Sequence, residues 1–422
     1  MPLHKLLVIT LSPQWIGGGY TQTMGFCQHL RQLGGFDIRV AYPQAGNVNS
    51  IQTSPRVRIH DVEGFSYHAI RPTLPAIEFN RYADNSAWDD LLSWADSCQV
   101  MGGGIAQGFP ASKSQTPYAI WVASTREADG AEAYRHSSFL KKRWLDMQFH
   151  FIRRFERETL HKASEVFVIS EYTRRLLESS YDLQIPDHNC IPVPVEADFF
   201  KPDPEVDKSQ NTICYVGRVN DPRKQIPLLL SALRRVLDRG VEVHLKMAGE
   251  MPNEHIQQVV RTLKLEPFVE FVGQVPAAEL PGFYQSSLIN VLPSQEEGQG
   301  IVVLEAMGCE VPTVATRCGG PESLIDNGRD GFLIANGDEN ELAEKIALLI
   351  KNPEQALAMG RLGREHVLLK HTPEKAYARI IDFHLGAARR AGAIDLPASF
   401  ASQTPSLSTG ASPSASPDYP RT

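Results

Sequence analysis

Residues 294–308 read SQEEGQGIVVLEAMG and follow an uninterrupted apolar run at 288–292. The apolar run predicts a strand buried on both faces, and the segment 301–309 predicts a helix. The loop between them contains two glycines and two glutamates. Ligands of open α/β sheets bind at the carboxyl ends of the strands, so this loop is the first candidate for a binding site.

The same alternation of strands and helices extends to both sides of this loop. Strands are expected at 212–216, 242–248, 269–272, 288–292 and 313–315, and helices at 227–239, 254–265, 277–285 and 301–309. Three more helices are expected at 339–351, 353–370 and 373–391. This repetition predicts an α/β fold with a mostly parallel sheet and helices on both of its faces.

The first half of the chain begins in a similar way. A strand at 6–10, a glycine-rich segment at 12–19, a helix at 21–33 and a strand at 37–41 are expected there. Pro, Gly and polar residues interrupt the pattern at 44–135, where 119–123 is the best strand candidate. A long helix rich in Arg and aromatic residues at 139–161, a strand at 165–170 and a helix at 171–179 complete this half.

A proline-dense segment at 191–204 predicts a linker between two domains, and a chain of 422 residues suits two cores. We therefore expect an N-terminal domain at 1–203 and a C-terminal domain at 204–371. The segment 393–422 is rich in Ser, Pro and Thr and poor in bulky apolar residues, which predicts a disordered tail.

The composition of the chain argues against some classes of function, nucleic-acid binding first among them. The net charge of -7 gives no general attraction to nucleic acid, and binding to anionic lipid would need a local basic patch. The Arg-rich helix at 141–157 either rests on such lipid or is a solvated helix face, which is the more frequent explanation.

The six cysteines are scattered and form no zinc-ligand spacing, so we expect reduced, structural cysteines and no metal site. With no signal peptide and no apolar stretch of membrane-spanning length, a cytoplasmic location is expected, with peripheral contact to the inner face of a membrane as an option.

Two further features of the loop and its helix suit a diphosphate ligand. Gly298 and Gly300 let the backbone approach a ligand closely, and a helix that begins near Ile301 directs unpaired N–H groups at an anion. Glu305 lies in an otherwise apolar helix, where a carboxylate needs a partner. That partner is either a ligand's ribose hydroxyls or a basic residue such as Arg317.

A second loop carries cations. The sequence CYVGRVNDPRK at 214–224 follows a predicted strand, and fixed positive charges there can neutralise a leaving diphosphate. The alternative is a solvated basic turn. A third feature, Gly17-Gly18-Gly19, follows the first strand and is either a simple turn or part of a site.

Glu297 and Glu305, separated by seven residues within an EGxG…EAM context, resemble the Glu-x7-Glu motif of glycosyltransferase family 4. The resemblance is dense over 212–335 and thin over 40–160. It implies the GT-B architecture, in which two Rossmann-like domains face a central cleft and a C-terminal helix, here 372–392, crosses back to the N-terminal domain. It also implies a retaining, metal-independent hexosyl transfer from a nucleotide-diphosphate sugar, UDP- or GDP-linked, to a glycan, glycolipid or small hydroxyl acceptor.

The resemblance assigns roles to individual residues. Glu297, Arg218 and Lys224 are expected to be catalytic, with Arg223 as the rival of Lys224 for the second cation. Glu305 is expected at the ribose, and Gln299 stands where the family often has an aromatic residue. The donor-binding residues are expected to be Gly17, Gly18, Gly19, Gly217, Arg223, Gly298, Gln299, Gly300, Ile301, Val302 and Glu305.

One departure concerns the acceptor side. Many family members carry a histidine after an N-terminal strand, and the comparable stretch here, IWVASTRE at 120–127, has none. Either Ser124, Thr125, Arg126 or Glu127 lines the acceptor side, or the domain is too divergent to align. A non-catalytic nucleotide-sugar-binding GT-B protein and a GT-B epimerase or phosphorylase are the alternative functions.

Overall fold

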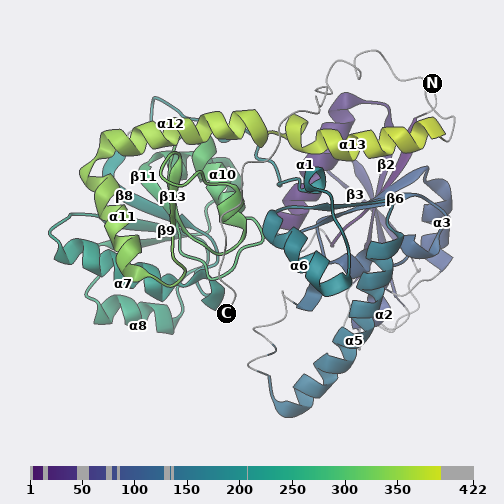
Figure 1. Ribbon diagram of the computed structural model, residues 1–422, viewed down its shortest axis with the longest axis horizontal. Helices are drawn as coiled ribbons and strands as arrows, with labels where there is room; N and C mark the ends of the chain where they lie inside the picture. The colour runs from purple at the N-terminus through teal and green to yellow at the C-terminus, as the bar shows by residue number, and fades with distance from the viewer. Residues whose placement is uncertain are drawn as a thin grey trace.

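The computed structural model describes residues 3–12, 18–44, 57–72, 78–82, 86–127, 134, 137–206 and 208–390. These residues form two parallel-sheet α/β domains that lie side by side, with helices α12 and α13 in line across one edge of both (Figure 1). The expected disordered tail at 393–422 and Gly17 fall outside the described residues.

The N-terminal domain is built on a seven-stranded sheet with the order β3-β4-β2-β1-β5-β6-β7. Its strands are β1 (His4–Ile9), β2 (Phe36–Pro43), β3 (Val57–Val62), β4 (Phe65–Ile70), β5 (Ser97–Val100), β6 (Tyr118–Val122) and β7 (Glu165–Val168). All neighbours are parallel except β3 and β4, which form an edge hairpin. Its turn is Glu63-Gly64, with φ of 51° and 78°, the left-handed conformation that two-residue hairpin turns require.

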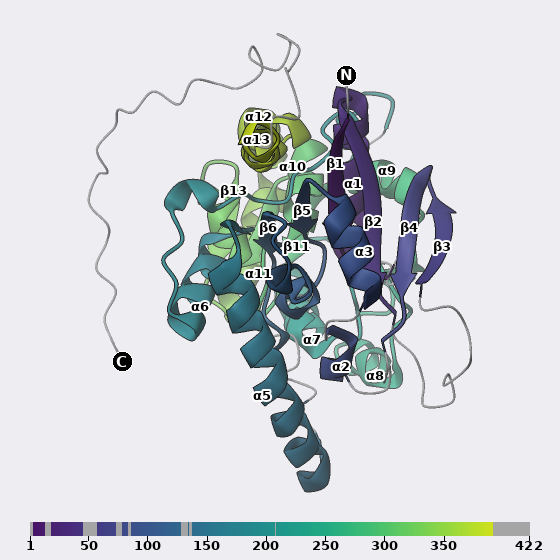
Figure 2. The same ribbon diagram turned by 90° about the vertical axis from the view of Figure 1, so that its right-hand side faces the viewer.

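Helices cover both faces of this sheet. They are α1 (Gly18–Leu33), α2 (Glu78–Tyr82), α3 (Ser86–Trp94), α5 (Phe139–Lys162) and α6 (Glu171–Tyr181). The central strands β1 and β6 read as apolar runs because helices bury them from both sides, and β5 is buried at every residue although two of its four residues are polar. Figure 2 shows α5 extending well beyond the body of the domain.

The C-terminal domain contains a six-stranded, wholly parallel sheet with the order β10-β9-β8-β11-β12-β13. Its strands are β8 (Ser209–Val216), β9 (His244–Ala248), β10 (Val269–Gly273), β11 (Ser287–Leu292), β12 (Thr313–Thr316) and β13 (Gly331–Ile334). Its helices are α7 (Ile226–Asp238), α8 (Glu254–Thr262), α9 (Leu280–Gln285), α10 (Ile301–Gly308), α11 (Glu339–Lys351) and α12 (Pro353–Lys370). The central strand β11 is buried at every residue, as its sequence predicted.

The last helix, α13 (Pro373–Arg390), packs on α1 and β5 of the N-terminal domain. Beneath it, buried polar groups form a chain in which His4 Nε2 lies 2.7 Å from Ser97 Oγ and Ser97 Oγ lies 2.8 Å from His384 Nδ1. His384 Nε2 lies 3.0 Å from Gln99 Oε1, an acceptor, so Nε2 carries the proton and Nδ1 accepts one from Ser97. His384 is therefore a neutral, satisfied histidine.

Several elements differ from the sequence-based expectation. The hairpin β3–β4, the strands β5 and β13 and the helices α2 and α3 were not predicted. The helix expected at 277–285 is a short 3-10 turn at Ala277–Glu279 followed by α9.

All six cysteines are free. Across the described ranges, every helix is too short or too polar to cross a bilayer.

Candidate functional site

A cavity of about 530 Å³ lies between the carboxyl ends of the two sheets and takes its lining from both domains. From the C-terminal domain, it is lined by the loop after β8 and the loop after β11. From the N-terminal domain, it is lined by the start of α1 and by the loops after β5 and β6. Most of the residues expected at the site meet here, and they come from loops that are far apart in the sequence.

Glu297 is fixed at the cavity wall by contacts on both its side chain and its backbone. Its carboxylate forms an ion pair with the Lys224 ammonium and accepts a 2.7 Å hydrogen bond from Ser294 Oγ. Its backbone N–H donates to the Cys318 carbonyl at 2.9 Å, and its carbonyl accepts from the Gly320 N–H at 2.8 Å. Both Glu297 and Lys224 line the cavity, so a charged pair faces whatever binds there.

Arg218 and Arg223 share one carboxylate but take different positions. Asp221 Oδ2 lies 2.8 Å from Arg218 Nη2 and 3.0 Å from Arg223 Nη2. Burial alone would raise the pKa of Asp221, but its hydrogen bonds to Arg223 and the charges of both arginines outweigh this and lower the pKa. Arg218 lines the cavity, with 60% of its side chain exposed, whereas Arg223 is not among the lining residues. Lys224 is thus the second cation at the cavity.

The loop from Gly298 to Gly300 leads into α10 at the cavity. Gly300 precedes the first helical residue with a φ of 81°, a left-handed conformation that favours glycine. No side chain caps this helix start, and helix geometry leaves the N–H groups of Ile301 and Val302 without intrahelical acceptors. Both residues line the cavity, so the positive end of α10 is available to an anion.

The side chain of Gln299 is engaged by the linker between the domains. Its Oε1 accepts a 2.7 Å hydrogen bond from the Val193 N–H, and its Nε2 donates a 2.8 Å bond to the Val193 carbonyl. Gln299 is buried, and its amide is paired on both sides. Gln299 therefore ties the loop to the linker.

Glu305 lies one turn further along α10, outside the residues that line the cavity. Its Oε2 accepts a 2.7 Å hydrogen bond from the Tyr284 hydroxyl. Burial raises the pKa of Glu305, and the hydrogen bond from Tyr284 offsets part of this rise. Arg317, the alternative partner considered from the sequence, instead lies 3.7 Å from Glu322.

The N-terminal domain contributes backbone and small groups to the opposite wall. Gly19 and Gly102 approach so closely that a Cβ on Gly19 would lie 2.0 Å from the Gly102 carbonyl oxygen. Gly18 is the first residue of α1. Gln22 lines it with a buried Nε2 that has no hydrogen-bond partner among the described residues. Sequence reasoning missed Gln22 and the triplet Gly102–Gly104, although that triplet was a visible glycine signal.

Of the four candidates for the acceptor side, only Ser124 lines the cavity. Thr125 is buried. The Arg126 guanidinium makes two hydrogen bonds to the Glu78 carboxylate, at 2.5 and 3.0 Å. Glu127 is exposed and lies 3.8 Å from Arg153.

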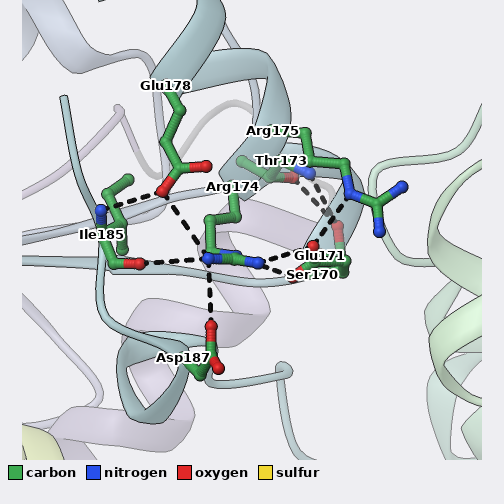
Figure 3. A network of polar contacts seen from close by, with 8 residues as sticks. All are labelled: Ser170, Glu171, Thr173, Arg174, Arg175, Glu178, Ile185 and Asp187. Carbon is green, nitrogen blue, oxygen red and sulfur yellow. Dashed lines mark hydrogen bonds and ion pairs between the residues drawn. The ribbon is translucent and has the colours of Figure 1, made fainter. Parts of the chain in front are cut away.

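Helix α6 contacts the C-terminal domain beside the Glu297 loop. The Tyr172 hydroxyl donates a 2.8 Å hydrogen bond to Glu296 Oε1, next to the Glu297 loop. Figure 3 shows how the base of this helix is held: Arg174 bridges Glu171, Glu178, Asp187 and the Ile185 carbonyl. The Ser170 hydroxyl caps the helix by accepting from the Thr173 N–H.

The donor set of the cavity does not resemble a metal site. Nowhere in the described ranges do three His, Cys, Asp or Glu side chains gather in a way that could hold an ion. Positive charge at the cavity is supplied by Arg218 and Lys224 and by the start of α10.

Comparison with known families matches residues 210–352 to the family described as glycosyl transferases group 1. This segment contains the loop after β8, the Glu297 loop, α10 and Glu305.

Curated relatives cover a similar part of the chain. The chain is 28% identical over 230 residues to a D-inositol 3-phosphate glycosyltransferase of Corynebacterium jeikeium, covering 50% of this chain and 55% of that protein. It is 30% identical over 225 residues to a GDP-mannose-dependent alpha-(1-6)-phosphatidylinositol monomannoside mannosyltransferase of Mycolicibacterium smegmatis. That match covers 49% of this chain and 58% of that protein. The chain thus spans between half and two thirds of the length of these relatives.

Solved structures share the fold over nearly the whole chain. Sucrose-phosphate synthase from Thermosynechococcus elongatus superposes with a TM-score of 0.70 at 19% identity, covering 92% of this chain and all of that one. Anabaena HepE in complex with UDP gives a TM-score of 0.66 at 15% identity, covering 93% of this chain and all of that one. At this identity the comparison establishes the two-domain GT-B architecture.

Proposed function

We propose that this chain, a glycosyltransferase family 4-like protein with the GT-B fold, is a retaining glycosyltransferase. It moves a hexosyl unit from a nucleotide-diphosphate sugar to a hydroxyl acceptor. The C-terminal domain, 204–371, binds the donor, and the N-terminal domain, 1–203, binds the acceptor.

One observation carries the proposal: Arg218, Lys224, Glu297 and the open start of α10 face a single cavity between the two sheets. Two cations and a helix N-terminus suit a diphosphate, and an adjacent carboxylate suits sugar hydroxyls. The cavity is also lined by the opposite domain, so an acceptor on that side would lie against the donor sugar.

The arrangement supports a division of roles during transfer. Arg218 and Lys224 stabilise the negative charge that develops on the leaving diphosphate, since fixed charges in a partly enclosed site need no reorganisation. Glu297, held by Lys224 and Ser294, orients the sugar. The departing phosphate helps to deprotonate the acceptor hydroxyl from the face it leaves, which retains the anomeric configuration.

Glu305 has a supporting role in this proposal. Its carboxylate accepts from Tyr284 and lies one turn of α10 behind the cavity lining. Reaching a ribose there requires the nucleoside to lie along α10, past Val302. Ribose hydroxyls that donate to Glu305 would share it with Tyr284.

The identity of the donor and acceptor belongs to the same proposal. The relatives named above include a GDP-mannose-dependent enzyme, and a structural neighbour was solved with UDP. We propose a UDP- or GDP-linked hexose as donor and a glycan or glycolipid as acceptor. The reaction takes place at the cytoplasmic face of a membrane, with no cofactor besides the donor itself.

Substitution tests the proposal. Arg218→Ala and Lys224→Ala should each lower turnover at least about a hundredfold, the effect of removing one group that stabilises transition-state charge. Arg329→Ala is the matched control, because Arg329 also pairs with an aspartate three residues away and is 64% exposed, but lies away from the cavity. Thermal unfolding verifies that each variant folds. Full turnover in Arg218→Ala, with donor hydrolysis or transfer measured by product analysis, would refute the assignment.

A further inference from the structure

The first half of α5 projects from the protein, and none of its side chains is fully buried. The buried side chains of α5 begin at Gln148, and residues 139–147 contain no buried side chain. Both views show this end of the helix extending away from the rest of the molecule (Figures 1 and 2). A projecting helix that is stable only as a solvated arm would be expected to be polar on all sides.

This arm is instead apolar along one side. Leu140, Trp144, Met147 and Phe151 are 80%, 46%, 41% and 39% exposed, and their spacing of four, three and four residues places them on one helix face. Phe139, 75% exposed, lies beside them. These five are among thirteen large hydrophobic side chains exposed in the described residues, so such side chains are concentrated on this helix.

Cations surround the apolar stripe. Besides Lys162, which pairs with Glu158 at the end of the helix, six occur on α5, and they are Lys141, Lys142, Arg143, Arg153, Arg154 and Arg157. Arg143 and Arg154 lie three residues after Leu140 and Phe151, which puts them beside the stripe. The chain as a whole carries a net charge of -7, so the positive charge of α5 is a local exception.

The acidic residues of α5 offset only part of this charge, because the helix has seven Lys and Arg residues against three acidic ones. Asp146 accepts a 2.8 Å hydrogen bond from the Tyr134 hydroxyl. Glu156 is buried and accepts from the Tyr181 hydroxyl. Glu158 forms ion pairs with Lys113 and Lys162, neither of which belongs to the six cations.

We propose that α5 seats its apolar stripe in the interfacial region of an anionic lipid bilayer. Aromatic and aliphatic side chains flanked by Lys and Arg are the features of helices that lie in a membrane interface. A second copy of this chain is a poorer occupant, because a symmetric contact would bring two sets of six cations together. The inference concerns a surface remote from the cavity and stands whether or not the chain transfers a sugar.

The second half of α5 provides a firm base for this arm. Phe155 stacks on Phe109 with 4.0 Å between ring centroids, and Gln148 Oε1 accepts from the Glu78 N–H at 3.0 Å. The Arg126 N–H donates to Glu156 at 3.2 Å, and Arg126 lies two residues after the cavity residue Ser124. A bilayer bound at α5 would therefore hold the cavity at a fixed height above its surface.

Vesicle sedimentation of the full chain tests this proposal. The probes are vesicles of phosphatidylcholine alone and of phosphatidylcholine mixed with phosphatidylglycerol. The wild type should bind only the anionic vesicles, and binding should weaken as salt rises. Leu140→Ser combined with Trp144→Ser should lower the partition coefficient at least about tenfold, because each removes apolar surface from the lipid. Lys141→Gln combined with Arg143→Gln should also lower it.

Leu369→Ser is the matched control, since Leu369 is a 67% exposed leucine on helix α12 and should leave vesicle binding unchanged. Brominated lipid should quench the tryptophan fluorescence of the wild type more than that of Trp144→Phe, a change that preserves the fold. Wild-type protein that stays in the supernatant with anionic vesicles would overturn the proposal. So would equal binding by the Leu140/Trp144 variant, or a wild-type dimer that this variant loses in sedimentation equilibrium.

Discussion

The hydroxyl of Tyr284 donates a 2.7 Å hydrogen bond to Oε2 of Glu305, and this bond joins α9 to α10 directly behind the cavity. Tyr284 is fully buried, and its burial together with the charge of Glu305 raises its pKa well above the usual value. The tyrosine therefore keeps its proton and remains a donor. Glu305 is thereby held in position before any ligand arrives.

Tyr284→Phe should lower the free energy of unfolding by about 1–3 kcal/mol, because it leaves the Glu305 carboxylate without this donor. The loss should be larger at pH 8 than at pH 5. The hydrogen bond favours the charged carboxylate, so removing it raises the pKa of Glu305 further. A carboxyl group whose pKa is raised in the folded protein lowers stability as the pH rises above its unfolded pKa of 4.5. Urea unfolding at both pH values measures this.

Tyr118→Phe is the control for that measurement. Tyr118 is also buried and donates a 2.6 Å hydrogen bond to the Thr159 carbonyl, an acceptor without charge. Its loss should be the same at both pH values. Equal pH dependence in the two variants would mean that Glu305 is not ionised beside Tyr284.

The ion pair between Lys224 and Glu297 should show strong coupling in a double-mutant cycle. The two side chains are only 14% and 13% exposed, so removing one leaves the other as a poorly solvated charge. Glu297→Gln and Lys224→Met should each cost more than their combination, with a coupling of about 3 kcal/mol in urea unfolding. The exposed pair Asp326–Arg329 should give about 0.5 kcal/mol or less. Additive losses at Lys224 and Glu297 would contradict this reading of the site.

Gly320→Ala should disturb the Glu297 loop without touching a ligand. A Cβ at Gly320 would lie 2.1 Å from the Gln299 Cα, a backbone atom that cannot move aside freely. The expected cost is about 1–3 kcal/mol in stability, with weaker nucleotide-sugar binding measured by calorimetry. Gly282→Ala is the control, since a Cβ there meets nothing within 4 Å. A Gly320→Ala protein as stable as the wild type would show that the loop has room to shift.

Acidification should destabilise the contact of α13 through His384. Burial holds the pKa of His384 at about 3, whereas an unfolded histidine titrates near 6.5. The unfolded chain therefore binds an extra proton in this window, and stability falls as pH drops from 6.5 toward 3. At pH 5 the loss from this one group is about 2 kcal/mol. The denaturation midpoint as a function of pH should have a shallower slope in His384→Gln, and exposed His255→Gln should keep the wild-type slope.

Turnover should be unaffected by excess chelator. Arg218, Lys224 and the start of α10 supply the positive charge that a divalent ion provides elsewhere. Product formation with and without EDTA measures this directly. Strict dependence on added Mg²⁺ or Mn²⁺ would show that these groups do not neutralise the diphosphate by themselves.

The parts of the fold that were predictable are those buried on both faces. Strand β11 reads as an apolar run because helices cover both of its sides, and the loop that follows it was placed correctly for the same reason. The edge strand β3 was missed because solvent faces much of it and its sequence, VRIHDV, has no apolar run. Strand β5 was missed because it is only four residues long, and the adjacent Gly102–Gly104 was overlooked with it.

Site residues whose partners are local were easier to predict than those held by distant ones. The GT-B fold was expected from the resemblance at the Glu297 loop, and the structural comparison confirmed it. The match of residues 210–352 to glycosyl transferases group 1 supports that resemblance over the same segment. The part played by Gln299 was not predictable, because its partner is the backbone of Val193, 106 residues away. For Glu305, the sequence left a ligand's ribose hydroxyls and Arg317 as possible partners, and Arg317 lies at Glu322 instead. The contact with Tyr284 was not foreseen, because periodicity does not reveal which residue of another helix lies opposite.

The docking of α13 on α1 and β5 has a consequence for synthesis on the ribosome. Part of the surface that it covers belongs to α1 and β5, and His384 follows its partner Ser97 by 287 residues. Until α13 emerges, Ser97 and Gln99 lack His384, and the N-terminal sheet lacks the helix that packs on it. The nascent N-terminal half must therefore wait, incompletely covered, while the whole second domain is translated.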